Sequence, residues 1–180
     1  KQKGVSLQYA KRIYAVANLC IAYPPFPSEK NMIPKMERNL TKAALEIQAR
    51  KTNSYSKAGF FTRLIYPRMM PKYLKVLPEI DKGFSISESC VSCGLCSRVC
   101  PRSNIVLVDD KPTFLHHCSC CMACVSYCPA KAIQYSYPAE QRAMLDTFFT
   151  RKMKLPTKRK RYHHPSITAQ DLMLNHKRFN

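Results

Sequence analysis

The stretch Cys90-Val-Ser-Cys93-Gly-Leu-Cys96-Ser-Arg-Val-Cys100-Pro101 decides the fold, because its cysteine pattern occurs twice in the chain. Each cysteine of the second copy lies 28 positions after its counterpart (118 − 90 = 28, and likewise for the other three), and Pro129 again follows the fourth. Ile105 and Ile133 keep the same spacing. The middle of the chain is therefore an internal duplication of the pattern C-x2-C-x2-C-x3-C-P. The second copy consists of Cys118, Cys121, Cys124 and Cys128.

Three chemistries compete for these eight cysteines. Disulfides need an oxidising compartment, no segment directs export, and eight cysteines offer no preferred pairing. Structural zinc would use two Cys-x2-Cys pairs, such as those that begin at Cys90 and Cys118, and would leave the other four cysteines without a role. Iron–sulfur ligation uses all eight, since three closely spaced thiolates and a more distant fourth reach the four iron corners of a [4Fe–4S] cubane.

With this motif, residues 82–138 resemble a bacterial-type ferredoxin with two [4Fe–4S] clusters. In runs of this kind the fourth cysteine ligates the other cluster, so the predicted ligand sets are crossed. Cluster I then takes Cys90, Cys93, Cys96 and Cys128. Cluster II takes Cys118, Cys121, Cys124 and Cys100. No aspartate replaces a fourth ligand, so a three-iron cluster is not indicated.

Local patterns between the cysteines predict a small α+β unit. Alternation predicts a strand from Phe84, and residues 105–108 and 113–115 flank a turn at 109–111 as in a hairpin. Residues 133–135 are expected to pair with the strand at Phe84, and short helical turns are expected at 97–100 and 125–128. The predicted core is thin, as suits a domain in which clusters replace packing. Its members are Phe84, Ile86, Ile105, Val106, Phe114, Leu115, Ile133 and Tyr135.

Four other cysteine and histidine side chains receive no ligand role. Cys20 is expected to be buried in an apolar stretch, and Cys120 to be a small loop residue. His116 and His117 are expected to be loop residues, because eight cysteines already fill both sites. Two cations inside the motifs, Arg98 and Lys131, are expected to favour the reduced, more negative clusters.

Charge divides the chain further. The 180 residues carry 30 Lys and Arg against 11 Asp and Glu, a formal net charge of +19. Residues 81–150 hold six of each sign, so the excess lies in the two flanks. Together with the cysteines this predicts four parts: 1–51, a linker at 52–81, the ferredoxin domain at 82–138 and a basic tail at 139–180. The composition is globular, and no apolar run is long enough to span a bilayer.

The flanks resemble parts of flavodoxin–ferredoxin fusion proteins. Val5, Leu7 and Tyr9 predict a strand, 18–33 a loop, and Pro34 the first position of a helix ending near Lys51. The tail 161–168 is also similar to that family. The resemblance implies that residues 1–51 are a partial α/β, flavodoxin-like strand–helix remnant, that FMN binds only in a full-length parent, and that a chain beginning at Lys1 is a fragment or processed product.

The linker and tail invite two surface hypotheses. Residues 60–70 mix aromatic, Met and basic side chains, but Pro67 and Pro71 are expected to interrupt a membrane-surface helix, which favours packing or partner docking. The runs 151–154 and 158–161 suggest nucleic acid, yet no aromatic platform accompanies them, and basic runs are usually solvated.

Electron transfer is the predicted function, because the cofactor supplies the chemistry and no nucleophile is required. One alternative is that the chain is the electron-transfer part of a flavin and iron–sulfur oxidoreductase, which leaves open whether it is an enzyme. Another is a binding module with clusters as structural staples. The basic flanks favour an acidic redox partner, a flavoprotein or a ferredoxin, and the unpaired thiolates favour the cytoplasm.

Overall fold

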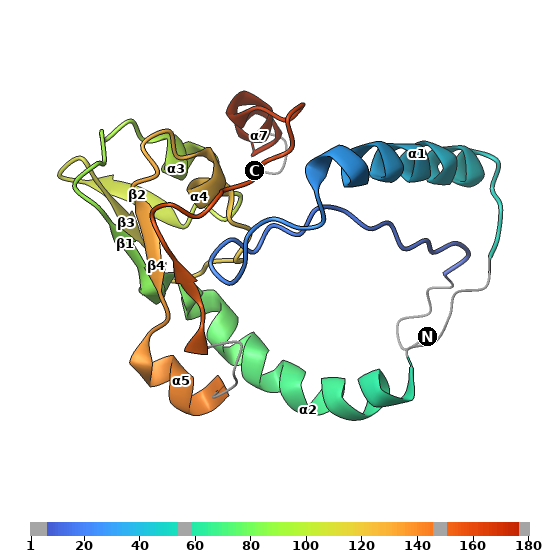
Figure 1. The fold of residues 1–180 in the computed structure, drawn as a ribbon, viewed down its shortest axis with the longest axis horizontal. Coiled ribbons are helices and arrows are strands. Elements are labelled where there is room, and N and C mark those ends of the chain that lie inside the picture. The colour runs from blue at the N-terminus through green and yellow to red at the C-terminus, as the bar shows by residue number, and fades with distance from the viewer. Residues whose placement is uncertain (1–6, 54–58, 146–150, 177–180) are drawn as a thin grey trace. The chain divides into compact units, whose positions relative to one another are not determined.

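The structure is a computed structural model that describes residues 7–53, 59–145 and 151–176. The chain forms two compact units that interleave in sequence (Figure 1). The first comprises Lys1–Ala17 and Phe26–Tyr66, and the second comprises Asn18–Pro25 and Pro67–Asn180. The predicted division at residues 51, 81 and 138 remains a prediction.

The first unit holds no strand in residues 7–16, so the strand predicted there is wrong for the described residues, and Val5 lies outside them. A single antiparallel bridge joins Ala17 to Phe26. A side chain, rather than a neighbouring strand, hydrogen-bonds to this extended backbone. Asn53 accepts from the backbone N of Ala10 at 2.9 Å and donates to its carbonyl at 2.9 Å.

Helix α1 (Glu29–Gln48) begins five residues before Pro34, which corrects the predicted start. The turn forms already at Ser28, whose carbonyl accepts hydrogen bonds from the backbone N of Asn31 and Met32. Pro34 therefore lies inside the helix. The helix ends earlier than predicted, at Gln48, where Arg50 adopts a left-handed φ of 50°.

Helix α2 (Phe60–Val76) is continuous through Pro67 and Pro71, so the predicted interruption is wrong. Each proline removes one N–H from the helix ladder. The two are four residues apart, so the carbonyls that lose a donor, those of Arg63 and Pro67, belong to exposed residues on the same side of the helix, where water can serve them.

The second unit contains the 3₁₀ helix η1 (Leu77–Gly83) and two small antiparallel sheets. One sheet has the order β1-β4-β5 and the other pairs β2 with β3 (Figure 1). The strands are β1 (Phe84–Ile86), β2 (Ile105–Val108), β3 (Lys111–Phe114), β4 (Ile133–Ser136) and β5 (Lys154–Leu155). The helices are α3 (Leu95–Arg98), α4 (Ala123–Tyr127), α5 (Ala139–Leu145) and α7 (Ala169–His176).

Most of the predicted pairing is confirmed. Phe84 faces Tyr135 in the β1–β4 pair, and Ile105 faces Phe114 in the hairpin. Both hairpin turn residues, Asp109 and Asp110, have positive φ, the geometry that matches the twist of two antiparallel strands. The helical turns are present but begin two residues earlier than predicted. Strand β5 was not predicted.

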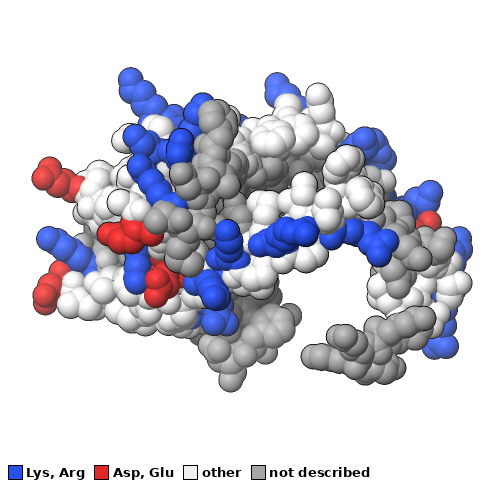
Figure 2. Space-filling model, turned by 90° about the horizontal axis from the view of Figure 1, so that it is seen from below, with Lys and Arg blue, Asp and Glu red and all other residues white. Residues whose placement is uncertain are grey.

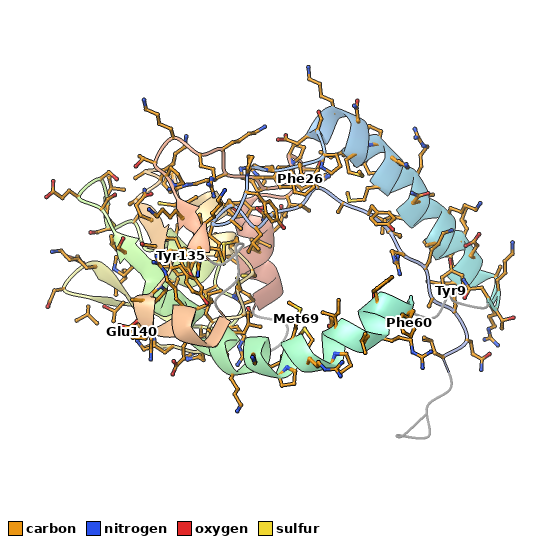
Figure 3. The ribbon with its side chains drawn as sticks, turned by 60° about the horizontal axis from the view of Figure 1, so that its bottom comes forward. Tyr9, Phe26, Phe60, Met69, Tyr135 and Glu140 are labelled. Carbon is orange, nitrogen blue, oxygen red and sulfur yellow. The ribbon has the colours of Figure 1, made fainter. Side chains whose placement is uncertain are left out.

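The core of the second unit centres on Tyr135, which lies among densely packed side chains (Figure 3). Phe84 stacks on Phe114 at 5.4 Å and meets Tyr135 edge-on at 5.0 Å. Val106 and Leu115 were predicted in the core but are 38% and 45% exposed, because this two-stranded hairpin buries one face only. Several core members come from outside the predicted domain: Cys20, Ile21, Val76, Ile80, Met153 and Leu155.

Charged side chains are spread unevenly. Figure 2 shows Lys and Arg across the visible face and most of the visible Asp and Glu on its left. Helix α2 contains basic residues and no acidic one, and it leaves Phe60 and Phe61 exposed. Among the described residues, none of the helices has the length and apolar character needed to cross a bilayer.

Candidate metal centre

The two cysteine motifs adopt the same backbone course. Helices α3 and α4 each start after a residue in the left-handed region, Gly94 with φ 68° and Met122 with φ 62°, which lie 28 positions apart. Two further left-handed pairs keep that spacing: Ser92 with Cys120, and Ser103 with Lys131. The duplication seen in the sequence is thus also a duplication of loop geometry, and it turns both cysteine loops the same way.

A first hollow, of about 380 Å³ counting open solvent, is lined by the four cysteines predicted for cluster I. Three come from the first motif, and Cys128 comes from the end of α4. Apolar residues close the walls, among them Ile86 and Ile133 from the paired strands β1 and β4. The cysteines are Cys90, Cys93, Cys96 and Cys128.

A second hollow, of about 340 Å³ counting open solvent, is lined by the four cysteines predicted for cluster II. Here Cys100 crosses over from the first motif. Phe84, Ile105 and Phe114 form apolar walls, and Asn104 adds a polar one. The cysteines are Cys100, Cys118, Cys121 and Cys124.

The thiols that shift the pKa of Cys96 lie in the first hollow, whereas those that shift the pKa of Cys124 come from both hollows. Burial raises the pKa of Cys96, and the nearby thiols of the first hollow raise it further. Burial raises the pKa of Cys118 to about 11 and that of Cys124 well above its usual range. The thiols that add to the Cys124 shift are those of Cys121, Cys118, Cys100 and Cys96. Buried, mutually repelling thiolates need a cation among them, which ligation would supply.

Backbone amides point at several of these sulfurs. The N–H of Asn104 donates to Sγ of Cys100 at 3.3 Å, and that of Ala132 donates to Sγ of Cys128 at 3.3 Å. These two bonds are again 28 residues apart. Cys120 N donates to Sγ of Cys118 at 3.2 Å. Such N–H···S bonds favour a negatively charged sulfur and are one means by which a protein adjusts a cluster's potential.

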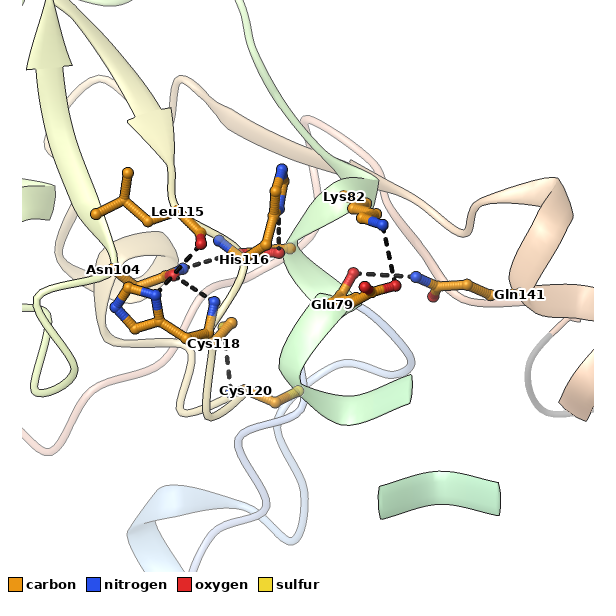
Figure 4. Close-up of polar contacts among 10 residues, drawn as sticks. Glu79, Lys82, Asn104, Leu115, His116, Cys118, Cys120 and Gln141 are labelled. Carbon is orange, nitrogen blue, oxygen red and sulfur yellow. Dashed lines mark hydrogen bonds and ion pairs between the residues drawn. The ribbon is translucent and has the colours of Figure 1, made fainter. Parts of the chain in front are cut away.

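A buried carboxylate holds the loop before Cys118, an arrangement that sequence reasoning missed. Asp81 is 1% exposed and accepts from Asn104 Nδ2 at 2.5 Å and from the backbone N of His116 at 3.2 Å. Its other oxygen lies 2.9 Å from Nδ1 of His116. Asn104 Oδ1 in turn accepts from the N of His117 at 2.7 Å (Figure 4). Nothing in the local pattern of η1 marks Asp81 as buried.

The structure also tests the residues for which no ligand role was predicted. Cys20 is fully buried, as predicted. Cys120 is half-buried, and burial raises its pKa to about 12. His116 and His117 lie in the loop before Cys118, as predicted, but each holds the loop through hydrogen bonds. Arg98 donates to the carbonyl of Cys93 at 3.0 Å, which ties α3 to its own cysteine loop.

The C-terminal tail packs on the cysteine unit. Arg159 Nη1 donates to the carbonyls of Cys20 at 2.7 Å and Lys154 at 2.6 Å. Arg161 Nη2 donates to the carbonyl of Ile133 at 2.9 Å. Tyr127 OH donates to the carbonyl of Ile167, and its ring stacks on His163 at 4.6 Å. Part of the basic run at 158–161 therefore faces the protein, although a solvated run was expected.

A larger cavity lies beside the second hollow, and we name it the Cys121 cavity. It measures about 1360 Å³ counting open solvent, and exposed Cys121 forms part of its wall. Among the described residues, its lining includes Arg102 and two histidines and no acidic side chain. The lining residues are Asn18, Val99, Pro101, Arg102, Cys121, Ala123, Ser126, Tyr127, Tyr162, His163, His164, Ile167 and Leu172.

The residues present suit a [4Fe–4S] group better than a single ion. Within residues 7–53, 59–145 and 151–176, no group of three or more Cys, His, Asp or Glu could hold one metal ion. A cubane differs because each thiolate binds a separate iron corner, so its four ligands stand apart around a hollow. All ten cysteines are free, which leaves the eight predicted ligands available.

Comparison with known proteins identifies one part of this site. Residues 85–106 match the family model described as a 4Fe-4S binding domain, and that range contains the four cysteines of the first motif. The second motif lies outside the matched residues. No curated protein and no solved structure matches the chain. The chain thus contains an iron–sulfur domain of the ferredoxin type.

Proposed function

We propose that the chain transfers electrons through two [4Fe–4S] clusters held by the crossed ligand sets, as in a bacterial-type ferredoxin. The observation that supports this most directly is that each hollow is lined by one of the two predicted sets and by no cysteine of the other. When bound, such clusters accept and release single electrons. The chain's part is to ligate them, to shield them with apolar walls and to direct N–H donors at their sulfurs.

Exposure within the ligand sets suggests where electrons pass. Cys96 and Cys100 are buried, whereas Cys93 and Cys121 are exposed, one from each set. An exposed ligand brings the edge of a cluster close to a docked molecule. We therefore assign Cys93 and Cys121 as the points of exchange with partners, with transfer between the two sites inside the unit.

Anaerobic reconstitution tests the two-cluster proposal. The full chain should gain iron and sulfide sufficient for two [4Fe–4S] clusters and a visible absorption that dithionite bleaches reversibly. Reduction should also produce an EPR signal. Uptake of zinc but not iron, or a cluster that cannot be reversibly reduced, would overturn the proposal and favour a structural role.

A sharper test separates crossed from uncrossed ligation. Replacing Cys118, Cys121 and Cys124 by Ser removes three ligands of one cluster. In that background the crossed sets predict that adding Cys100→Ser keeps the remaining cluster, whereas adding Cys128→Ser destroys it. The uncrossed alternative predicts the reverse. Cys120→Ser in the wild-type chain is the matched control and should keep both clusters.

The proposed partner is an acidic redox protein, a flavoprotein or a ferredoxin, that docks at the Cys121 cavity. The cavity combines an exposed predicted ligand with Arg102 and histidines and lacks acidic lining residues. Complementary charge steers weak electron-transfer encounters. The association rate with an acidic ferredoxin should fall as salt rises, and Arg102→Glu should slow it more than Lys111→Glu, which changes the net charge equally. Equal effects of both variants would exclude docking there.

Two wider elements belong to the same proposal. The cytoplasm is the proposed compartment, supported by ten unpaired cysteines. Residues 1–51 are proposed to derive from a flavodoxin-like domain, with FMN bound only in a longer parent. Anaerobic titration of such a parent would decide whether it acts as an oxidoreductase, which requires substrate turnover, or only cycles as a carrier.

A further inference from the structure

Arg161 carries buried hydrogen-bond donors that no acceptor in the described part of the chain satisfies. Its Nη2 donates to the carbonyl of Ile133 at 2.9 Å. Its Nε and Nη1 are both buried and meet no acceptor. Buried N–H groups are nearly always paired, and a guanidinium keeps its charge in a protein. Two orphaned buried donors on a partly buried cation indicate an acceptor that binds beside them.

The surroundings of Arg161 point to the first hollow. Ile133, to which Arg161 is anchored, lines that hollow together with Ala132 and Cys128. Burial lowers the pKa of the Arg161 guanidinium, and the thiols of Cys128 and Cys20 oppose that shift because their ionised forms favour the cation. Of these two thiols, only Cys128 belongs to a predicted ligand set.

We propose that Arg161 is the partly buried counter-cation of the cluster in the first hollow and that its buried Nε and Nη1 atoms donate to sulfur acceptors of that site. The inference rests on the proposed two-cluster function. It makes the C-terminal tail a working part of the redox unit. Arg161 is a positioning and tuning residue in this proposal and does not itself carry the electron.

The sign of the effect follows from charge. Four thiolates outweigh the dipositive core of an oxidised cluster, so the site is already anionic, and reduction adds a further negative charge. A fixed cation close to it stabilises the reduced form more than the oxidised form, which raises the reduction potential. The low-polarity surroundings of Arg161 strengthen this effect compared with a solvated lysine or arginine.

Arg159 provides a matched control two residues away. It has the same charge and belongs to the same tail, but its Nη1 is occupied by the carbonyls of Cys20 and Lys154. Neither of those residues lines the first hollow. A general effect of removing a tail arginine should therefore appear equally in Arg159→Gln and Arg161→Gln, whereas an effect on one cluster should appear only in the latter.

The experiment is an EPR-monitored redox titration of the anaerobically reconstituted full chain and of Arg161→Gln, Arg161→Lys and Arg159→Gln. Iron and sulfide are counted in each sample. Arg161→Gln should lower the reduction potential of one cluster by about 59 mV, which corresponds to a tenfold change in the equilibrium constant of a one-electron reduction. The other cluster should move much less. Arg161→Lys should recover most of the shift, and Arg159→Gln should resemble the wild type.

The outcomes separate the inference from the function on which it rests. A wild-type chain that cannot be reduced reversibly sinks the proposed function. If the wild type has two titrating clusters and Arg161→Gln has the same reduction potentials, the inference is wrong while the proposed function stands. If Arg161→Gln fails to load a cluster, loading by Arg161→Lys supports the need for a cation there, and failure of both variants shows a packing role and overturns the charge assignment.

Discussion

Gly83 sits where β1 and β4 meet, and its missing side chain is what lets them approach. A Cβ at this position would lie 2.6 Å from Cε2 of Tyr135 and 2.7 Å from the carbonyl oxygen of Ser136. The backbone oxygen cannot move aside without disturbing the β4–β5 pair. We expect Gly83→Ala to destabilise the protein by about 1–3 kcal/mol, the usual cost of overpacking.

Denaturant unfolding of the reconstituted chain, followed by circular dichroism, measures this change. Gly59→Ala is the matched control, since a Cβ there would meet no heavy atom within 4 Å. Similar midpoints for the two variants would show that β1 and β4 can separate without cost.

The Asp81 network should be sensitive to the loss of a single acceptor. Asp81→Asn replaces one oxygen by an amide donor, so at least one of its three partner groups loses its acceptor. Hydrogen bonds to a carboxylate contribute about 1.5–3 kcal/mol, and we expect a loss of that size with faster release of iron from the Cys118 loop.

Glu79→Gln serves as its control. The Glu79–Lys82 pair is 3.0 Å long and exposed on both sides, so its loss should cost less than about 1 kcal/mol. Iron release rates that are equal in Asp81→Asn and Glu79→Gln would contradict a role for the network in holding that loop.

Residue identity is enough to propose two ligand sets, but it does not predict the loop backbone. Cysteine spacing is a covalent property of the chain, so both sets could be written down from sequence. Met122, by contrast, takes the left-handed conformation that Gly94 takes in the first motif. A methionine there is costly in isolation, and only the closing of the cysteine loop and nearly complete burial of Met122 hold it.

At the scale of elements, α1 is joined to the extended segment before it by one carboxylate. Glu46 accepts from Tyr9 OH at 2.5 Å and from Lys11 Nζ at 2.9 Å. These bonds lower the pKa of Glu46 to about 2, with the tyrosine contributing most. A lowered carboxyl pKa gives stabilisation that is complete above the ordinary value of 4.5 and disappears as pH falls towards 2.

We therefore expect the contact between Tyr9 and α1 to be insensitive to pH from 8 to about 5 and to weaken between about 4.5 and 2. NMR chemical shifts of Tyr9 and Glu46 would follow it. Glu46→Gln should abolish this dependence, and Glu37→Gln on the same helix should not. A transition near pH 6 would assign the contact to another group.

Helix α2 shows why some elements could not be predicted from the local pattern alone. Proline in a helix interior destabilises the helix strongly, so the sequence predicted that the helix would be interrupted at Pro67. The helix persists because its lost hydrogen bonds fall on exposed carbonyls. The opposite error occurred at residues 7–9, where alternation predicted a strand but the described residues form no neighbouring strand that could receive its hydrogen bonds.

At the scale of the whole molecule, the second unit is built from distant pieces of chain. Residues 18–25 contribute fully buried Ile21 to its core, and Arg159 reaches back 139 residues to the carbonyl of Cys20. Ile21→Ala should cost about 2–5 kcal/mol, as for other buried aliphatic truncations. Ile47→Ala removes the same atoms from a side chain that is 58% exposed and should cost less than about 0.5 kcal/mol.

Loss of visible cluster absorption in denaturant is the appropriate measurement for this pair, because it monitors the second unit alone. Equal denaturation midpoints for Ile21→Ala and Ile47→Ala would show that residues 18–25 contact the second unit without stabilising it.

Such long-range parts could not be predicted from sequence. The hairpin depends on contacts between near neighbours, so the local pattern was sufficient to predict it. Cys20, Asp81 and Arg161 acquire their roles from residues far away in the chain, and nothing adjacent to them marks those roles. The sequence showed that Cys20 is apolar enough for burial, but not which core it enters.

The 28-residue repetition of left-handed positions and N–H···S bonds gives the cysteine unit an approximate twofold symmetry. In the crossed arrangement each half holds three ligands for its own site and offers the fourth to the other half. A peptide with one copy of the motif could not complete a site in this way alone. Two identical copies could complete both, so a symmetric dimer of half-length chains is a sufficient ancestor for this unit and a practical minimal design for rebuilding it.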